Sequence, residues 1–173
     1  MNVIIPWLLY PWFTDWFQSK TIALLITIVI ILLLCFKHLR EGYIIDWSVL
    51  ITFLVLFALE GTHHHLPDDV VRTMSFSFLF IGCLFTIIAG KPFTVKYAKK
   101  QVEEEYWEHE SFQLANSKIS LVWCVAFLVN SVISFWGYFN LQVGGVVLIV
   151  TYLIMLSASV FTFIYPKILS ARY

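Results

Sequence analysis

The chain of 173 residues is 60% hydrophobic and 18% aromatic, and only 13% of its residues are charged. Soluble domains have about 25% charged residues, so this composition excludes an ordinary soluble protein and predicts one membrane domain over residues 1–173. The formal net charge is zero, which excludes nucleic acid as a partner attracted by overall charge. Cys35, Cys83 and Cys124 lie in apolar runs without motif spacing, and we expect them to pack as small apolar side chains.

The first 20 residues are apolar and rich in tryptophan, but they also contain Pro6, Pro11 and Asp15. Tryptophan favours the headgroup level of a membrane, and internal prolines break a straight helix. We therefore expect residues 1–20 to form an interfacial or re-entrant segment on the outer side. The alternative is a sixth span, which would place the N-terminus inside.

Three apolar runs follow, each with charged or turn-forming residues at its ends. The first run lies between Lys20 and Lys37, whose aliphatic stems can reach from the hydrocarbon to the headgroups. The third run ends at Lys91 and Pro92, where we expect the charge and the missing N–H to stop the helix together. These runs predict membrane spans at about 21–36, 43–59 and 73–90.

A stretch of 48 residues, 119–166, contains no Asp, Glu, Lys or Arg. About 20 apolar residues cross a bilayer, so this stretch must fold back on itself, and the glycine-bearing segment 137–145 is the expected break. The pattern predicts spans at 119–138 and 143–165, with Pro166 ending the last helix. Runs of this length are typical of helices rather than of barrel strands, so we predict an all-α, polytopic bundle with five transmembrane helices.

Basic residues predict the orientation, because cytoplasmic loops retain lysine and arginine. Two basic residues, Lys20 and Arg72, fall on one side of the predicted spans. The other nine fall on the opposite side, which predicts a multi-pass membrane protein with a cytoplasmic C-terminus; they are Lys37, Arg40, Lys91, Lys96, Lys99, Lys100, Lys118, Lys167 and Arg172.

The largest polar segment, 91–118, is predicted to be a cytoplasmic connector. Its apolar residues recur at spacings of three and four, which predicts an amphipathic helix lying on the membrane with the stripe Val95, Ala98, Val102 and Tyr106. Its first half is basic and is expected near anionic headgroups, whereas its second half is acidic and is expected to face water or a partner. The alternative is a solvated charged connector without further role.

A loop between the second and third spans contains several side chains of the types that bind divalent metals. Contiguous histidines do not share one helical face, and their spacing matches no zinc signature, so we expect neither a metal site nor a cofactor. The loop is instead expected to be solvated, with Asp68 or Asp69 paired with Arg72. The candidate ligands of a metal, if one binds, are His63, His64, His65, Glu60 and Asp68.

Two polar residues lie within the predicted spans. Asn130 is near the middle of the fourth span, where we expect its amide to hydrogen-bond across helices; the alternative is that it lines a substrate or ion path. Asp46 lies just inside the second span, and the expected counter-charge is Lys91 or Lys118 at nearby helix ends. No arrangement of catalytic side chains is recognisable, so no catalytic residue is expected.

A family resemblance covers most of the chain and is clearest over residues 72–136. The chain resembles the bacterial intracellular septation protein A family of inner-membrane proteins in the segment Gly90-Lys91-Pro92-Phe93 and in Trp107, Asn116, Trp123, Phe127, Asn130 and Trp136. The histidine-rich loop and the glutamate-rich connector depart from the family pattern. The resemblance implies a cell-envelope protein linked to septation and cell-wall synthesis, with no catalytic residues to carry over.

Two classes of function are compatible with these observations. The first is a non-enzymatic scaffold of the bacterial envelope, whose partners would be membrane lipids, division or wall-synthesis proteins, or a second copy of the chain. The second is a small transporter or a lipid-acting membrane enzyme that uses Asn130, Asp46 or the His63–His65 loop. A polar cavity that reaches Asn130 would favour the second class, and a dry bundle would favour the first.

Overall fold

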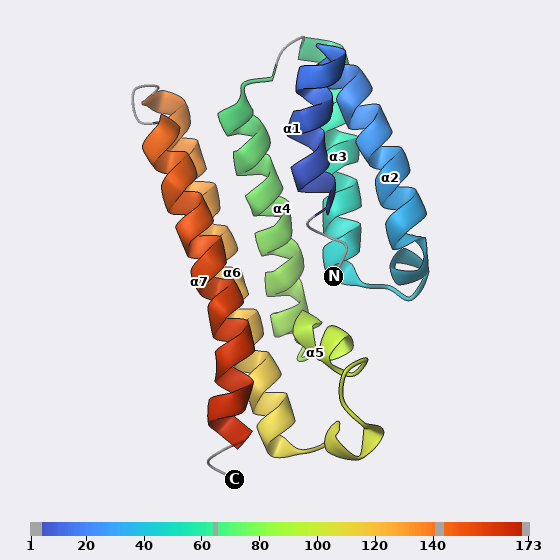
Figure 1. The fold of residues 1–173 in the computed structure, drawn as a ribbon, viewed down its shortest axis with the longest axis vertical. Helices are drawn as coiled ribbons and strands as arrows, with labels where there is room; N and C mark the ends of the chain where they lie inside the picture. Colours follow the sequence, from blue (N-terminus) through green and yellow to red (C-terminus); the bar gives the residue numbers. More distant parts are fainter. Residues whose placement is uncertain (1–4, 64–65, 141–143, 171–173) are drawn as a thin grey trace.

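The computed structural model describes residues 5–63, 66–140 and 144–170. These residues form seven α-helices and one short 3-10 helix (Figure 1). Their bounds are α1 Ile5–Phe17, α2 Lys20–Arg40, α3 Ile44–His63, α4 Asp68–Ile88, α5 Phe93–Ala98, η2 Glu104–Tyr106, α6 Glu110–Phe139 and α7 Gly144–Ser170.

Five of these helices, α2, α3, α4, α6 and α7, are long and apolar enough to cross a membrane. They coincide with the five predicted spans, so the all-α, five-span fold class is confirmed. The helices extend beyond the apolar runs because their flanking polar residues continue the helix. For example, α6 begins at Glu110, where a carboxylate in the first turn is favoured by the partial positive charge of the helix N-terminus.

The long helices pack in chain order rather than as a closed ring. α2 contacts α3, α3 contacts α4, α4 contacts α6, and α6 contacts α7 (Figure 1). α2 and α7 therefore lie at the two edges of the row and leave many apolar side chains exposed, as a surface facing lipid requires. We call the end of the row where α2 stops, α3 starts and α5 lies the connector end (Figure 1).

α1 packs beside α2 and runs along the same axis as the long helices, from partway along the row to its other end (Figure 1). The ring of Trp7 lies 4.7 Å from that of Phe53 in α3, and the ring of Tyr10 lies 5.8 Å from it. These contacts pack α1 against α2 and α3. Residues 1–4 lie outside the described part of the chain.

Small side chains and hydroxyl groups join the central helices. Ser77 of α4 and Ser131 of α6 are hydrogen-bonded at 2.7 Å, and the indole N–H of Trp123 in α6 donates to the hydroxyl of Thr162 in α7 at 2.9 Å. At Gly82 the helices approach so closely that a Cβ atom would lie 2.1 Å from Oγ of Ser48. Interhelical polar contacts and small residues are typical of helix packing in membranes.

The predicted end of the last helix at Pro166 is wrong, because α7 continues through this proline to Ser170. A proline removes a single backbone hydrogen bond, and near the end of a 27-residue helix this loss does not interrupt the remaining bonds. By contrast, α4 stops before Lys91 and Pro92 as expected, with Gly90 in the left-handed region at φ +67°.

The single amphipathic helix expected over 91–118 does not form. Its last nine residues belong to α6, and the connector, which we define as residues 89–109, contains only α5 and η2. Val102 and Tyr106 of the expected apolar stripe are exposed. A continuous helix would place Lys96 beside Lys100 and Glu104 beside Glu108 at the i,i+4 spacing, where like charges destabilise a helix.

Candidate functional site

The candidate site is a group of polar side chains around the buried carboxylate of Asp46 at the connector end. Asp46 lies in the first turn of α3, where the helix N-terminus favours a carboxylate, and its side chain has no exposed surface. A buried carboxylate is costly unless other groups compensate it. The side chains next to Asp46 must therefore offset the free-energy cost of burying its charge.

Two side chains approach the same oxygen of Asp46 from different elements. The hydroxyl of Tyr97 in α5 donates a hydrogen bond to Oδ2 at 2.6 Å, and Nδ1 of His38 in α2 lies 3.7 Å from it. The expected counter-charges, Lys91 and Lys118, are not the side chains found within ion-pair distance of Asp46. The lysines were expected from charge alone, whereas the folded connector places a phenol and an imidazole there.

The buried ring of Tyr43 packs against both His38 and Tyr97. Its ring stacks on His38 at 4.6 Å and meets Tyr97 edge-on at 4.8 Å, while its hydroxyl donates to the carbonyl of Lys96 at 3.2 Å. We call His38, Tyr43, Asp46 and Tyr97 the Asp46 cluster. Because its members come from α2, the α2–α3 turn, α3 and α5, the cluster ties the connector to the membrane helices.

A second anchor fixes the other side of α5 to α6. The hydroxyl of Thr94 donates to the carbonyl of Asn116 at 2.8 Å and lies 2.8 Å from the hydroxyl of Ser120. Phe93, just before it, is buried in the core. The residues of α5 that enter the fold are therefore Phe93, Thr94 and Tyr97, and not the predicted stripe.

Burial raises the pKa of the Tyr97 hydroxyl, and the neighbouring Asp46 carboxylate raises it further. The phenol therefore stays protonated and acts as a hydrogen-bond donor across the physiological pH range. This state is the one that a buried carboxylate requires, since two anions at 2.6 Å would repel each other.

The cluster combines a carboxylate, an imidazole and a phenol, which are groups that can hold or transfer a proton. The Asp46 side chain has no exposed surface, and no member of the cluster lines either the polar pocket at the other end of the row or the apolar groove between α6 and α7, both described below. The arrangement acts as a polar clamp between the connector and the row of helices.

The structure contradicts the expected hydrogen bond of Asn130. The side chain is fully buried in α6, and neither its Oδ1 nor its Nδ2 has a hydrogen-bond partner within the described ranges. The cross-helix bond to α4 is made by the next residue, Ser131. A one-residue difference turns a side chain by 100° on a helix, and a single apolar run gives no signal to decide which face meets α4.

At the other end of the row, the acidic and basic side chains pair locally. Asp69 pairs with Arg72, as expected, and Asp68 pairs with Nζ of Lys20 at 2.8 Å. Glu60 accepts a hydrogen bond from the backbone N–H of Leu66 at 2.9 Å. The described residues contain no group of side chains arranged for a metal ion, while His64, His65 and the side chain of His63 lie outside this description.

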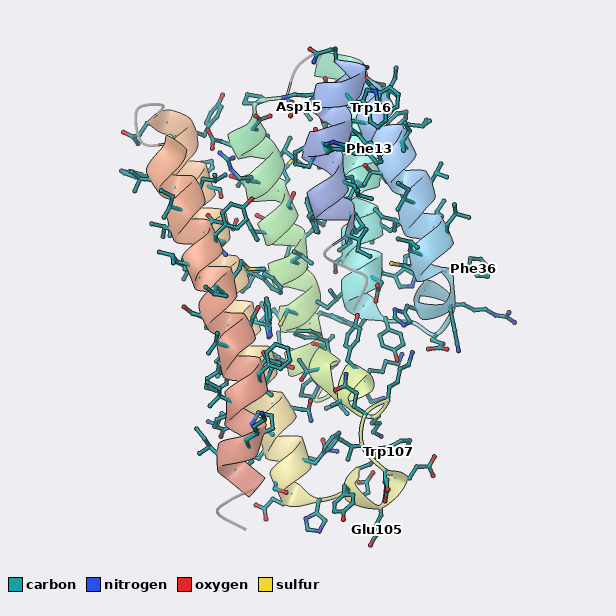
Figure 2. All side chains as sticks on the ribbon, viewed as in Figure 1. Phe13, Asp15, Trp16, Phe36, Glu105 and Trp107 are labelled. Atoms are coloured by element: carbon teal, nitrogen blue, oxygen red, sulfur yellow. The ribbon has the colours of Figure 1, made fainter. Side chains whose placement is uncertain are left out.

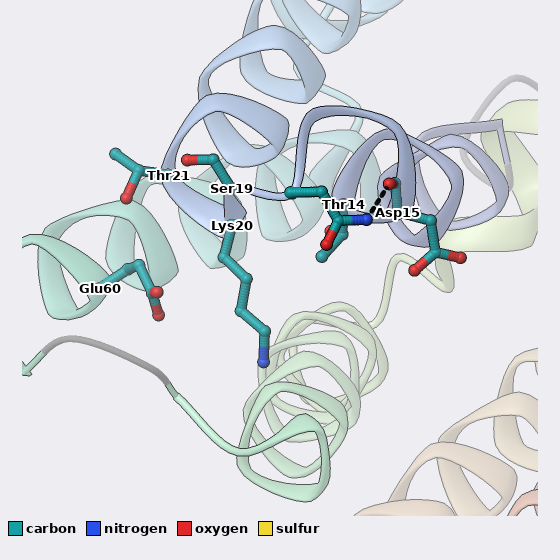
Figure 3. A pocket seen from close by; sticks show the side chains of 7 residues that line it. Thr14, Asp15, Ser19, Lys20, Thr21 and Glu60 are labelled. Carbon is teal, nitrogen blue, oxygen red and sulfur yellow. Dashed lines mark hydrogen bonds between the residues drawn. The ribbon is translucent and has the colours of Figure 1, made fainter.

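A shallow polar pocket of 320 Å³ lies at the same end, where α1 turns into α2. Figure 3 shows Lys20 of α2 and Glu60 of α3 bordering it, whereas the carboxylate of Asp15 points to the side away from them. Since Lys20 is engaged by Asp68 and by the carbonyl of Leu66, its charge is already compensated.

Sequence reasoning identified Asp46 but missed His38, Tyr43 and Tyr97. A signal was present in the i,i+4 pair Phe93 and Tyr97, which places two aromatic rings on one face of α5. The pairing with Asp46 spans 51 residues and depends on how α5 folds back, which no local pattern specifies.

Fold and site together define a multi-pass helical membrane protein with a connector clamped to one end of its helices. Among known proteins, no family model, no curated sequence and no solved structure matches this chain.

Proposed function

We propose that this multi-pass membrane protein is a non-enzymatic scaffold that docks partner proteins through the acidic part of its connector. The Asp46 cluster and the Thr94 anchor hold α5 from both sides. Five exposed carboxylates follow, which are Glu103, Glu104, Glu105 and Glu108 in the connector and Glu110 in the first turn of α6. An exposed acidic segment that follows a helix held at two sites supports a docking role, because charge complementarity gives an interface its specificity.

The segregation of basic residues supports an orientation with the connector in the cytoplasm. The resemblance to the intracellular septation protein A family makes septation and cell-wall synthesis in the bacterial inner membrane the proposed setting. A partner that fits the connector presents a basic surface. A second copy of the chain fits less well, since the same acidic segments would repel each other.

The alternative of a transporter or membrane enzyme draws no support from the cavities. The larger one, of 490 Å³, is an apolar groove between α6 and α7 lined mainly by valine, leucine and isoleucine, and it does not include Asn130 or Asp46. A polar pathway for an ion or a polar substrate needs hydrogen-bonding or charged side chains along its length. The groove lacks such side chains apart from Ser157.

The scaffold is tested by reversing the acidic segment, with Glu104, Glu105 and Glu108 changed to Lys. Exposed charges contribute little to stability, so the variant is expected to fold with an unchanged melting temperature. Crosslinking in cells from a photoreactive group at Gln101 is expected to lose its partner bands. Conversion of Lys118 to Glu serves as a control for charge at the same end, and an unchanged crosslinking profile in the triple variant would exclude docking through this segment.

A further inference from the structure

Four basic side chains from two distant segments gather at the connector end. Lys37 and Arg40 lie in the last turn of α2, and Lys96 and Lys100 come from the connector. We call these four residues the basic cluster. Glu41 is the carboxylate beside them, with 4.0 Å to Nζ of Lys37 and 3.3 Å to Nζ of Lys100. The buried carboxylate of Asp46 lies behind the Tyr43 ring, in the Asp46 cluster. Two carboxylates against four cations leave a local excess of positive charge.

The two connector lysines are held in place before any ligand arrives. Their ammonium groups lie 4.9 Å and 4.8 Å from the centre of the Tyr43 ring, for Lys96 and Lys100 respectively. Lys96 also donates to the carbonyl of Gly42 at 3.0 Å. A cation held over an aromatic ring loses less conformational entropy on binding an anion than a free lysine does.

The surface next to the basic cluster is apolar and exposed. Leu33 and Phe36 of α2 are 75% and 65% exposed, and Figure 2 shows Phe36 pointing outward from the row of helices. These side chains lie within one or two turns of Lys37 and Arg40, on the side of the predicted span. Cations at the end of a span and apolar side chains just inside it match the headgroup and the acyl chains of a lipid.

The other end of the row provides an internal comparison. Lys20 and Arg72 are paired there with Asp68 and Asp69, so neither cation leaves an excess of charge. The excess of positive charge is therefore a local feature of the basic cluster and not a general property of the helix ends.

We propose that the basic cluster binds the phosphate headgroup of an anionic phospholipid, whose acyl chains lie along Leu33 and Phe36. Such a site requires only that the five apolar helices cross a membrane. It is independent of the scaffold role, so failure of either proposal leaves the other standing.

The test is to purify the intact protein in mild detergent and to count retained lipids by native mass spectrometry after adding equal amounts of phosphatidylglycerol and phosphatidylcholine. The wild-type protein is expected to retain phosphatidylglycerol preferentially. Each lysine or arginine removed is expected to weaken this preference about fivefold, and a double variant on the order of 25-fold. The two double variants are Lys37→Gln with Arg40→Gln, and Lys96→Gln with Lys100→Gln.

The matched control is Lys118→Gln, which removes an exposed charge from α6 near the same end. Lys37 and Arg40 are exposed, so the double variant at these two residues measures binding without a loss of folding. This holds even if the variant at Lys96 and Lys100 is destabilised by loss of the Lys96 hydrogen bond. Equal retention of the two lipids by the wild-type protein would overturn the proposal, as would an equal loss of preference in Lys118→Gln. Displacement of the lipid by millimolar inorganic phosphate would assign the site to a free anion instead and would also overturn it.

Discussion

Tyr97 shows how one side chain can determine the position of a whole segment. Its hydroxyl donates a hydrogen bond to Oδ2 of the buried Asp46 carboxylate. The other oxygen, Oδ1, has no hydrogen-bond partner among the described residues. Removal of the Tyr97 hydroxyl would leave both carboxylate oxygens of Asp46 buried without a hydrogen-bond donor. The free energy at stake therefore includes the desolvation of Asp46 as well as one hydrogen bond.

We expect Tyr97→Phe to lower the free energy of unfolding by about 1–3 kcal/mol, the usual range for leaving a buried acceptor without its donor. Chemical denaturation in detergent measures this change, and limited proteolysis of the connector is expected to become faster. Tyr106→Phe is the matched control, because Tyr106 is half exposed and belongs to the same connector. Equal stability of both variants would show that the clamp is unimportant.

The raised pKa of Tyr97 makes the clamp sensitive to alkaline pH. An ordinary tyrosine has a pKa of about 10, so the contribution of the raised pKa to stability is complete below pH 10 and falls as the pH increases above it. We expect the wild-type protein to lose stability above about pH 10 more steeply than Tyr97→Phe does. Melting temperatures of the two proteins between neutral and alkaline pH measure the difference, and parallel curves would contradict it.

Asn130 presents the opposite case, a buried amide for which the described residues supply no hydrogen-bond partner. Replacement by leucine, of similar size, removes two polar atoms that are already unpaired. We expect Asn130→Leu to leave the free energy of unfolding unchanged or to raise it by about 1 kcal/mol. Ser131→Ala is the control, since it removes the bond to Ser77 and is expected to cost about 0.6 kcal/mol.

At the scale of helices, the sequence alone predicted the positions of the five spans but not the structure of the connector. Long uncharged runs have one stable solution in a membrane, because every backbone polar group must bond within its own helix. The connector obeys no such constraint. Whether Val102 or Tyr97 enters the fold depends on contacts with α3 and α6, and these are made only after the helices have packed.

The contact between α3 and α4 at Gly82 gives a prediction at this scale. A methyl group there would meet Oγ of Ser48 at 2.1 Å and its Cβ at 3.3 Å, so the hydroxyl must rotate and the helices must separate slightly. We expect Gly82→Ala to cost about 1–3 kcal/mol of unfolding free energy, as overpacking usually does. Thermal unfolding in detergent measures this loss.

Two further variants identify the cause of that loss. Ser48→Ala in the Gly82→Ala background removes the clashing oxygen and is expected to restore part of the stability. Gly61→Ala is the control, because a Cβ atom at Gly61 meets nothing within 4 Å. If Gly61→Ala were as harmful as Gly82→Ala, the loss would arise from a general effect on the helix backbone.

At the scale of the whole molecule, the distribution of charge and the order of the helices agree. α2, α4 and α7 run towards the connector end, and α3 and α6 start from it (Figure 1). The basic residues that follow or precede these ends in the sequence therefore share one side of the row. Figure 2 shows Glu105 at the far edge of the connector on that side, and its side chain is exposed, so a soluble reagent would reach it.

The last prediction is that this side faces the cytoplasm, because basic residues near the ends of spans are retained there. A single cysteine at position 105, introduced as Glu105→Cys in a chain whose three native cysteines are replaced by alanine, is expected to resist a membrane-impermeant thiol reagent in intact cells. The same cysteine is expected to react after the membrane is opened. Ser19→Cys, at the opposite end of α2, is the matched position and is expected to react in intact cells. Labelling of position 105 but not of position 19 in intact cells would reverse the topology and place the acidic segment outside, beyond the reach of any cytoplasmic partner.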